Sequence, residues 1–315
     1  MPQQSKLSAI LATGRISNLP TVWCNVLVAF LLIQLAILYF HDLTDTTLSL
    51  PLFITTCIAA SFLYVGGCLL GDAVDVEFDL AHKPDRPIPM GILTRKSVYT
   101  WASTLLSIGI SLPSAFLYFS TSEFHLYPLI TTLILAGAIV AYSLWHKRSP
   151  WIGLPLIGAC RLFLILFAAS VAAAPVSYCA LTLPTAIFAI AVGLFTVCFA
   201  SVARSESSPS PITWRKLLIA VMLLLPFTTK ISEVVIYDQL SFTAPEGTAI
   251  ILYWIWMVTA FGKINTNKGQ FVSMSLAGFC LLDACFASFF GWQWLLVCLI
   301  LFIFSLTLQK WAPAT

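Results

Sequence analysis

Long apolar stretches, separated by short polar segments, recur from one end of the chain to the other. Each holds roughly 18–23 residues, the length that an α-helix needs to cross a bilayer. The pattern predicts an all-α polytopic membrane helical bundle of nine to ten transmembrane helices, forming one domain over residues 1–315. The expected helices cover residues 19–40, 50–70, 97–119, 126–145, 151–174, 181–201, 216–236, 247–263, 271–289 and 292–309.

Two of these assignments leave alternatives. The stretch at 247–263 is short and has polar flanks, so it could be a re-entrant segment instead of a span. The last two stretches could be wrongly divided around Gly291. The first 14 residues are polar and no small-residue cleavage site follows, so no secretory signal is expected.

Composition agrees with a membrane protein. Hydrophobic residues make up 59% of the chain, and its mean hydropathy is +0.94, far above the value of a soluble domain. The nine cysteines form no CxxC pair and no Cys/His cluster, so we interpret them as small buried hydrophobes. The four histidines are scattered, which argues against a histidine-based metal site.

The basic residues indicate a topology. Nearly all of them fall in segments that the ten spans place on one side of the membrane, whereas the opposite segments hold acids and almost no basic residue. The positive-inside rule then puts both termini and the acidic segment 72–85 in the cytoplasm. The expected location is a bacterial inner (plasma) membrane. Because the basic residues act as topology signals, the net charge of +3 gives no reason to expect a nucleic-acid partner.

The segment 72–85 concentrates the charge of the chain, with five of its thirteen acids. Asp72, Asp75 and Asp79 are spaced i, i+3, i+7, which places all three carboxylates on one face of a continuous helix, with Glu77 nearly opposite. Such acids repel one another unless a cation neutralises them, and carboxylate oxygens suit Mg²⁺, which commonly joins one or two carboxylates to a substrate diphosphate. The alternative is a solvated acidic loop before the third span.

The motif at 71–91, GDAVDVEFD followed by KPDRPIPMG, resembles the first aspartate-rich motif of the UbiA superfamily of intramembrane prenyltransferases, usually NDxxDxxxD followed by RPIPxG. The segments at 15–20, 142–148 and 160–161 are similar to other parts of the family. The resemblance implies a bundle around a central cavity that opens laterally to lipid. It also implies a magnesium-bound prenyl diphosphate and transfer of its prenyl group to an aromatic or other lipophilic acceptor.

The chain departs from the family at a second motif, DxxxD, where Ala203 and Ser207 occupy the aspartate positions and only Glu206 supplies an acid. Gly71 also replaces the asparagine of the first motif. These losses remove ligands for a second magnesium ion, and Arg204 could instead supply positive charge directly to a diphosphate. Arg204 and Glu206 could also be mere loop charges.

The resemblance assigns roles to the charged residues. The catalytic set is Asp72, Asp75, Asp79 and Arg204; the metal ligands are Asp72, Asp75, Asp79 and Glu206; the diphosphate-binding set is Lys83, Arg86, Lys147, Arg161 and Arg204.

Polar residues inside the apolar stretches are costly and need a reason. For Arg161, contact with a diphosphate and an internal ion pair stay equally open. Asn25 and Asp283 are also polar groups inside spans. Asp283 lies far from the inferred cytoplasmic side, so a structural hydrogen bond is expected there, with catalysis as the alternative. Lys230 and Glu233 are expected to form a structural pair.

Three functions compete on this reading. The first is a prenyltransferase that uses Mg²⁺. The second is a non-catalytic UbiA-like membrane protein that binds or transports a lipid or metabolite. The third is a secondary transporter, which the clustering of acids at one surface, away from the bilayer midplane, disfavours.

Overall fold

The computed structural model describes residues 6–41, 49–147, 149–176, 180–204, 215–237 and 240–311. Within these ranges every regular element is helical, and ten helices are long and apolar enough to cross a membrane. The prediction of an all-α polytopic bundle is confirmed. The spans are α2 (Leu19–His41), α3 (Leu50–Val74), α5 (Arg95–Thr121), α6 (Leu126–Trp145), α7 (Pro150–Ala173), α8 (Leu183–Arg204), α9 with α10 (Arg215–Leu224 and Thr228–Tyr237), α11 (Ala244–Lys263), α12 (Lys268–Ala287) and α13 (Trp292–Trp311).

The structure settles the alternatives for the last spans. The eighth stretch forms the uninterrupted helix α11, which begins at Ala244, three residues before the predicted start, and reaches spanning length. Gly291 separates α12 from α13 with a φ of 109°, a conformation that favours glycine. The division at that glycine was therefore correct, and the count is ten among the described residues.

The seventh span differs from the single helix that its hydropathy predicts. It consists of α9 and α10 joined by a short 3-10 turn, Leu225–Phe227, that contains Pro226. A proline inside a helix removes a backbone hydrogen bond and displaces the preceding turn. Lys230 on α10 then donates to Glu233 at 2.6 Å and also to Glu246 on α11. The predicted pair is confirmed, and it extends to a link between two spans.

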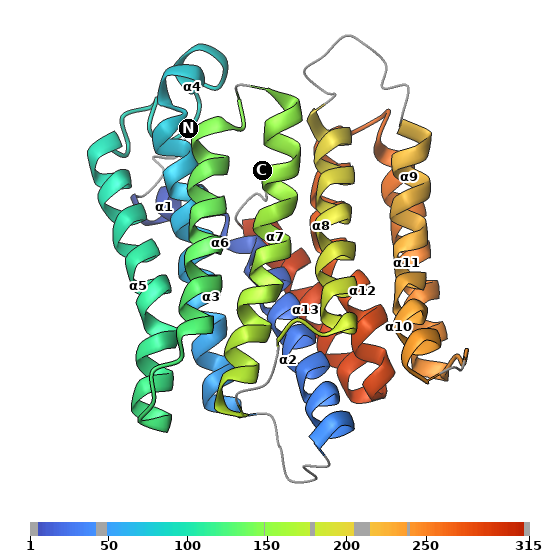
Figure 1. Ribbon diagram of the computed structural model, residues 1–315. Coiled ribbons are helices and arrows are strands. Elements are labelled where there is room, and N and C mark those ends of the chain that lie inside the picture. Colours follow the sequence, from blue (N-terminus) through green and yellow to red (C-terminus); the bar gives the residue numbers. More distant parts are fainter. Residues whose placement is uncertain are drawn as a thin grey trace.

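Two short helices lie outside the spans, next to the first two of them. The helix α1 (Lys6–Thr13) lies before the first span, and α4 (Val76–His82) follows α3 directly. In Figure 1, α4 lies at the same end of the bundle as the end of α6 and the start of α7. We call this the acidic end, because it carries Asp72, Asp75 and Asp79.

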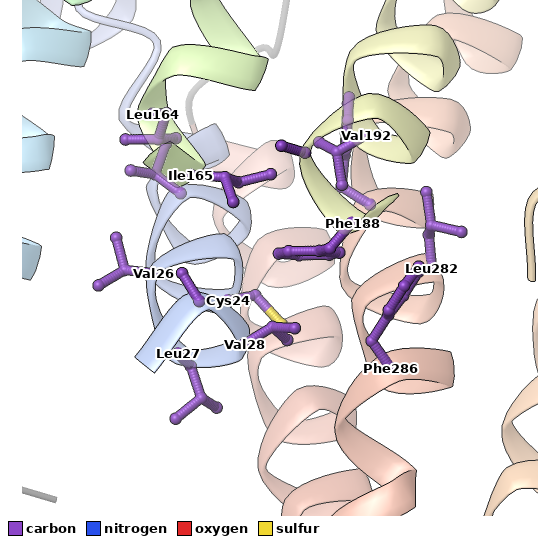
Figure 2. Packing of buried hydrophobic residues seen from close by; sticks show 14 of the residues in the cluster. Cys24, Val26, Leu27, Val28, Leu164, Ile165, Phe188, Val192, Leu282 and Phe286 are labelled. Carbon is purple, nitrogen blue, oxygen red and sulfur yellow. The ribbon is translucent and has the colours of Figure 1, made fainter. Parts of the chain in front are cut away.

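The spans are arranged around two central helices. Most of α2 and α12 is buried inside the bundle, whereas only a small part of α5 and α13 is buried. Far from the acidic end, side chains of α2, α7, α8 and α12 pack into an apolar core, where the rings of Phe188 and Phe286 lie 4.8 Å apart (Figure 2). This core holds the helices together below the charged site.

The close packing of α7 on α8 depends on two glycines. A Cβ atom added to Gly158 would lie 2.6 Å from Cγ2 of Val197 and 3.0 Å from the backbone oxygen of Gly193. Small residues that let helix backbones approach are a common means of association in membranes. This contact holds the backbones of α7 and α8 close together.

Gly158→Ala should therefore lower the melting temperature of the detergent-solubilised protein, at a cost of about 1–3 kcal/mol for overpacking. Gly137→Ala on α6 is the matched control, because no atom lies within 4 Å of the added Cβ. Equal melting temperatures for the two variants would show that the α7–α8 contact is not close-packed.

Candidate active site

The acidic segment does not form the continuous helix that its spacing suggested. The helix α3 ends at Val74, Asp75 has φ −81° and ψ 2°, and α4 begins at Val76. Helical hydrogen bonds continue across the bend. The backbone amide of Asp75 donates to the carbonyl oxygen of Gly71, and the amide of Asp79 donates to that of Asp75. Convergence of the three acids therefore arises from a bent helix pair and not from one straight face.

The carboxylates of Asp72 and Asp79 are nevertheless buried, at 9% and 1% residue exposure, whereas the side chain of Glu77 is 89% exposed. The prediction that Glu77 points away from the other acids is confirmed. Burial of several carboxylates side by side is unfavourable unless cations accompany them.

Two cations bridge the acids. Nη1 of Arg86 lies 3.2 Å from Oδ1 of Asp72 and 2.7 Å from Oδ2 of Asp79. Nζ of Lys147, in the turn that follows α6, lies 2.9 Å from Oδ2 of Asp75 and 3.7 Å from Oδ1 of Asp79. The three carboxylates thus share two cations that come from different parts of the chain.

Two further basic groups join this cluster, and sequence reasoning gave neither of them a site role. Nη2 of Arg15 lies 3.6 Å from Oδ1 of Asp72, and Nε2 of His146 lies 3.3 Å from Oδ2 of Asp75. Arg15 also has a φ of 47°, which is unfavourable for a residue with a side chain and is most common at functional sites. Their positions in the family-like segments 15–20 and 142–148 were the available signals.

The charges around Asp75 set its protonation. Burial alone would raise the pKa of this carboxyl, but hydrogen bonds from His146 and Lys147 outweigh burial and lower it. Asp75 is therefore an anion at neutral pH.

Lys83 makes no ion pair within the described part of the chain, and burial, together with the charge of Arg86, lowers its pKa.

The cluster lies at the mouth of a cavity of about 600 Å³ inside the bundle, and all its members except Asp79 line that cavity. Its upper wall carries charged groups, and its deeper wall is mainly apolar and aromatic. The charged lining residues are Arg15, Asp72, Asp75, Lys83, Arg86, His146, Lys147 and Arg161, and the deeper lining includes Leu63, Tyr64, Leu135, Ile139, Leu164 and Phe279. The predicted central cavity is confirmed, and it combines a charged mouth with an apolar interior.

Arg161 lines the same cavity, about midway along α7. Its guanidinium donates to Oδ1 of Asn25 and to the hydroxyl of Thr21, and Asn25 donates in turn to Asp283. No carboxylate among the described residues lies within ion-pair distance of Arg161, so a direct internal ion pair is excluded there. The structural hydrogen bond expected of Asp283 is present, and its donor is Asn25.

Only part of the region that corresponds to the second motif lies within the described residues. Ala203, near the end of α8, lines the cavity, so the position that carries an acid in the family-like motif is a methyl group here. Arg204 is the last residue of α8, but the placement of its side chain lies outside the description, as do Glu206 and Ser207 altogether. Their assigned roles stay predictions.

The donor set at the mouth suits Mg²⁺ by its chemistry. Oδ1 of Asp79 is buried and accepts no hydrogen bond from any residue in the described ranges. The same ranges contain no preset group of three His, Cys, Asp or Glu ligands. Magnesium usually takes one or two carboxylates and completes its shell with water and substrate phosphates, so the residues present fit such an ion once a diphosphate accompanies it.

A polytopic bundle with an acid-lined cavity mouth is the architecture expected of an intramembrane prenyltransferase, and the family comparison agrees. The model of the UbiA prenyltransferase family matches residues 44–280, more than half of the chain. The chain belongs to this family.

Similar proteins include digeranylgeranylglyceryl phosphate synthases. The chain is 32% identical to that of Methanoculleus marisnigri over 113 residues (34% of this chain, 35% of the relative) and 35% identical to that of Methanococcoides burtonii over 114 residues (35% and 37%). The matched part thus spans about a third of each relative's length. A solved structure concerning digeranylgeranylglyceryl phosphate synthase in membranes has a TM-score of 0.56 at 18% identity, covering 96% of this chain and 99% of that one, and shows the shared fold.

The lowered pKa of Asp75 predicts how pH changes the effect of removing its partner. A carboxyl whose pKa is depressed in the folded state contributes stability above its ordinary value of about 3.9, and this contribution is lost as pH falls through the folded value. Lys147→Met should therefore lower the melting temperature at pH 7, and the gap to the parent should narrow as pH falls below about 4. Lys96→Met, at an exposed position, is the control. A gap that stays constant from pH 7 to pH 3 would contradict the pairing.

Proposed function

We propose that this protein is an intramembrane prenyltransferase that transfers a prenyl group from a magnesium-bound prenyl diphosphate to an aromatic or other lipophilic acceptor. The observation that carries the proposal is the placement of two carboxylates, Asp72 and Asp75, with several cations on the wall of a largely apolar cavity, where Arg86 and Lys147 link them to the buried Asp79. Family membership and the resemblance to isoprenoid-lipid synthases support the choice of donor. With the acidic end facing the cytoplasm of a bacterial inner membrane, the donor would enter from that side.

The acidic and basic residues at the mouth would have different roles. Asp72, Asp75 and Asp79 would hold Mg²⁺, which when bound supplies positive charge to the diphosphate oxygens. Arg86 and Lys147 lie among these carboxylates, so their positive charges would also be available to a diphosphate bound at the mouth. Lys83 and Arg204 complete the proposed cationic set.

The chemical step is a substitution at the first carbon of the prenyl chain. The bond between that carbon and the diphosphate oxygen breaks, and its electron pair stays on the diphosphate. A carbon or oxygen of the acceptor forms the new bond, and the proton that the acceptor loses passes to the released diphosphate. The apolar interior, which includes Leu63, Leu135 and Ile139, would keep water from the electrophilic carbon.

A second function is supported by the cavity wall at Ala203. Because a methyl group stands where the family-like second motif has an acid, the site has fewer metal ligands than the full motif supplies. A protein of this kind could bind or transport a lipid or metabolite without catalysis. The two functions share the donor-binding step and differ in turnover.

We expect magnesium-dependent binding of geranylgeranyl diphosphate to the purified protein. Asp72→Asn and Asp75→Asn should each weaken it by at least tenfold, or about 1.4 kcal/mol, because each removes an anionic oxygen ligand. Glu77→Gln is the matched control, since this acid belongs to the same segment but is exposed. Binding to both aspartate variants as tight as to the parent would refute the metal role.

Turnover separates the two functions. Diphosphate release should accompany binding in the presence of magnesium and membrane lipid extract, with prenyl diphosphates of several chain lengths as donors. Binding without release for every donor would favour the binding or transport function.

A further inference from the structure

A second hollow lies on the surface of the bundle, outside the central cavity. It is open to the surroundings, has a volume of about 650 Å³ and is lined by Arg95, Lys96, Tyr99, Thr100, Ser103 and Thr104. All six belong to roughly the first three turns of α5, a span of which only a small part is buried. In Figure 1, α5 lies at the edge of the bundle. The hollow therefore faces the surrounding lipid near the acidic end.

Two cations and no acid line this hollow. Nε of Arg95 donates to the backbone oxygen of Ala73 at 3.0 Å, and its Cζ lies 5.7 Å from the ring centre of Tyr99, so the guanidinium is held in place. Nη1 of Arg95 lies 3.8 Å from the carboxylate of Glu77, which is beyond hydrogen-bond distance, and the Glu77 side chain is 89% exposed. Lys96 is exposed and makes no ion pair within the described part of the chain. Both positive charges are therefore available to an anion.

Hydroxyl groups line the hollow below the two cations. Thr100 donates to the backbone oxygen of Lys96, whereas Ser103 and Thr104 are exposed and make no hydrogen bond within the described ranges. Unpaired hydroxyls are unfavourable where lipid replaces water, so these groups need an acceptor from outside the chain. The ester oxygens of a phospholipid are acceptors that lie deeper in the membrane than its phosphate. One lipid molecule can thus meet both the cations and the hydroxyls.

We infer that this hollow binds an anionic phospholipid, with the phosphate at Arg95 and Lys96 and the ester oxygens at the hydroxyls below. Charge complementarity selects this occupant. Basic residues at the end of a span attract anionic lipids, whereas a zwitterionic lipid also carries a cation, which the two lining cations repel. Tyr99 agrees with this position, because tyrosine is enriched at the membrane–water interface.

The site is separate from the proposed donor site but bears on its stability. The hollow and the central cavity share no lining residue. Arg95 nevertheless holds the backbone oxygen of Ala73, the residue that follows Asp72 near the end of α3. A headgroup that fixes the guanidinium therefore also steadies the end of α3. Anionic lipid is expected to raise the melting temperature for this reason.

Native mass spectrometry of the full-length protein, delipidated in a non-ionic detergent, tests the inference. Phosphatidylglycerol and phosphatidylcholine with the same acyl chains are titrated separately, and the Kd of the first bound lipid is read from the bound fraction. The parent should bind phosphatidylglycerol at least tenfold more tightly. Lys96→Gln should reduce this preference at least threefold, and Arg95→Gln with Lys96→Gln should abolish it. Phosphatidylglycerol should raise the melting temperature of the parent but not of the double variant.

The matched control is Lys263→Gln with Lys268→Gln. It also removes two exposed cations, from the connection between α11 and α12, which the alternation of the spans places at the same end of the bundle as the start of α5. This variant should keep the preference of the parent.

A further variant guards against a structural effect of Arg95→Gln, which also removes the bond to Ala73. Ser103→Leu with Thr104→Leu keeps both cations and fills the lower part of the hollow. It should weaken the binding of phosphatidylglycerol at least threefold and leave the melting temperature of the lipid-free protein unchanged.

Several results would overturn the inference. They are equal affinity of the parent for the two lipids, a preference that persists in Arg95→Gln with Lys96→Gln, and a loss of preference in the lysine control as large as in that variant. Inorganic phosphate that stabilises the parent as much as phosphatidylglycerol does would show a site for free anions instead of lipid. A second copy that covers α5 would give a dimer in the lipid-free spectra and would equally refute the lipid assignment. The assay contains neither magnesium nor prenyl diphosphate, so its failure leaves the proposed function untouched.

Discussion

The site depends on the sharing of two cations by three carboxylates, of which Asp72 and Asp79 are buried and Asp75 is partly buried. Arg86 lies between Asp72 and Asp79, and Lys147 lies between Asp75 and Asp79. Without these cations the acids would repel one another in a poorly solvated place, and the bend at Asp75 that brings them together would be disfavoured. The same contacts tie α3, α4, the following loop and α6 into one rigid mouth.

The interior obeys the same electrostatic constraint in a different form. Below the mouth, the amide of Asn25 separates the guanidinium of Arg161 from the carboxylate of Asp283. The amide oxygen accepts a hydrogen bond from Nη1 of Arg161, and the amide nitrogen donates to both oxygens of Asp283. The cavity thus combines a charged mouth, an apolar lining and the guanidinium of Arg161.

Much of the fold could be predicted because hydropathy alone defines a span. The boundaries of α6 were correct, whereas the turn at Pro226 and the bend at Asp75 needed local backbone detail that hydropathy does not carry. Of the site, the acids and Arg86 were predicted from one contiguous segment. Arg15 and His146 were missed as site residues because only the folded bundle brings the ends of distant helices together, and a spacing rule along one helix says nothing of such contacts.

The origins of the paired groups also bear on how the protein is made. Asp72, Asp75 and Asp79 leave the ribosome together, but their partners are dispersed, with Arg15 before them, Arg86 soon after and Lys147 only at the end of α6. The pairing of Asp75 with Lys147 therefore has to wait for the synthesis and insertion of two more spans. During that interval the nascent chain contains the carboxylate of Asp75 without its partner Lys147. The order in which the ion pairs of the mouth form is therefore set by translation.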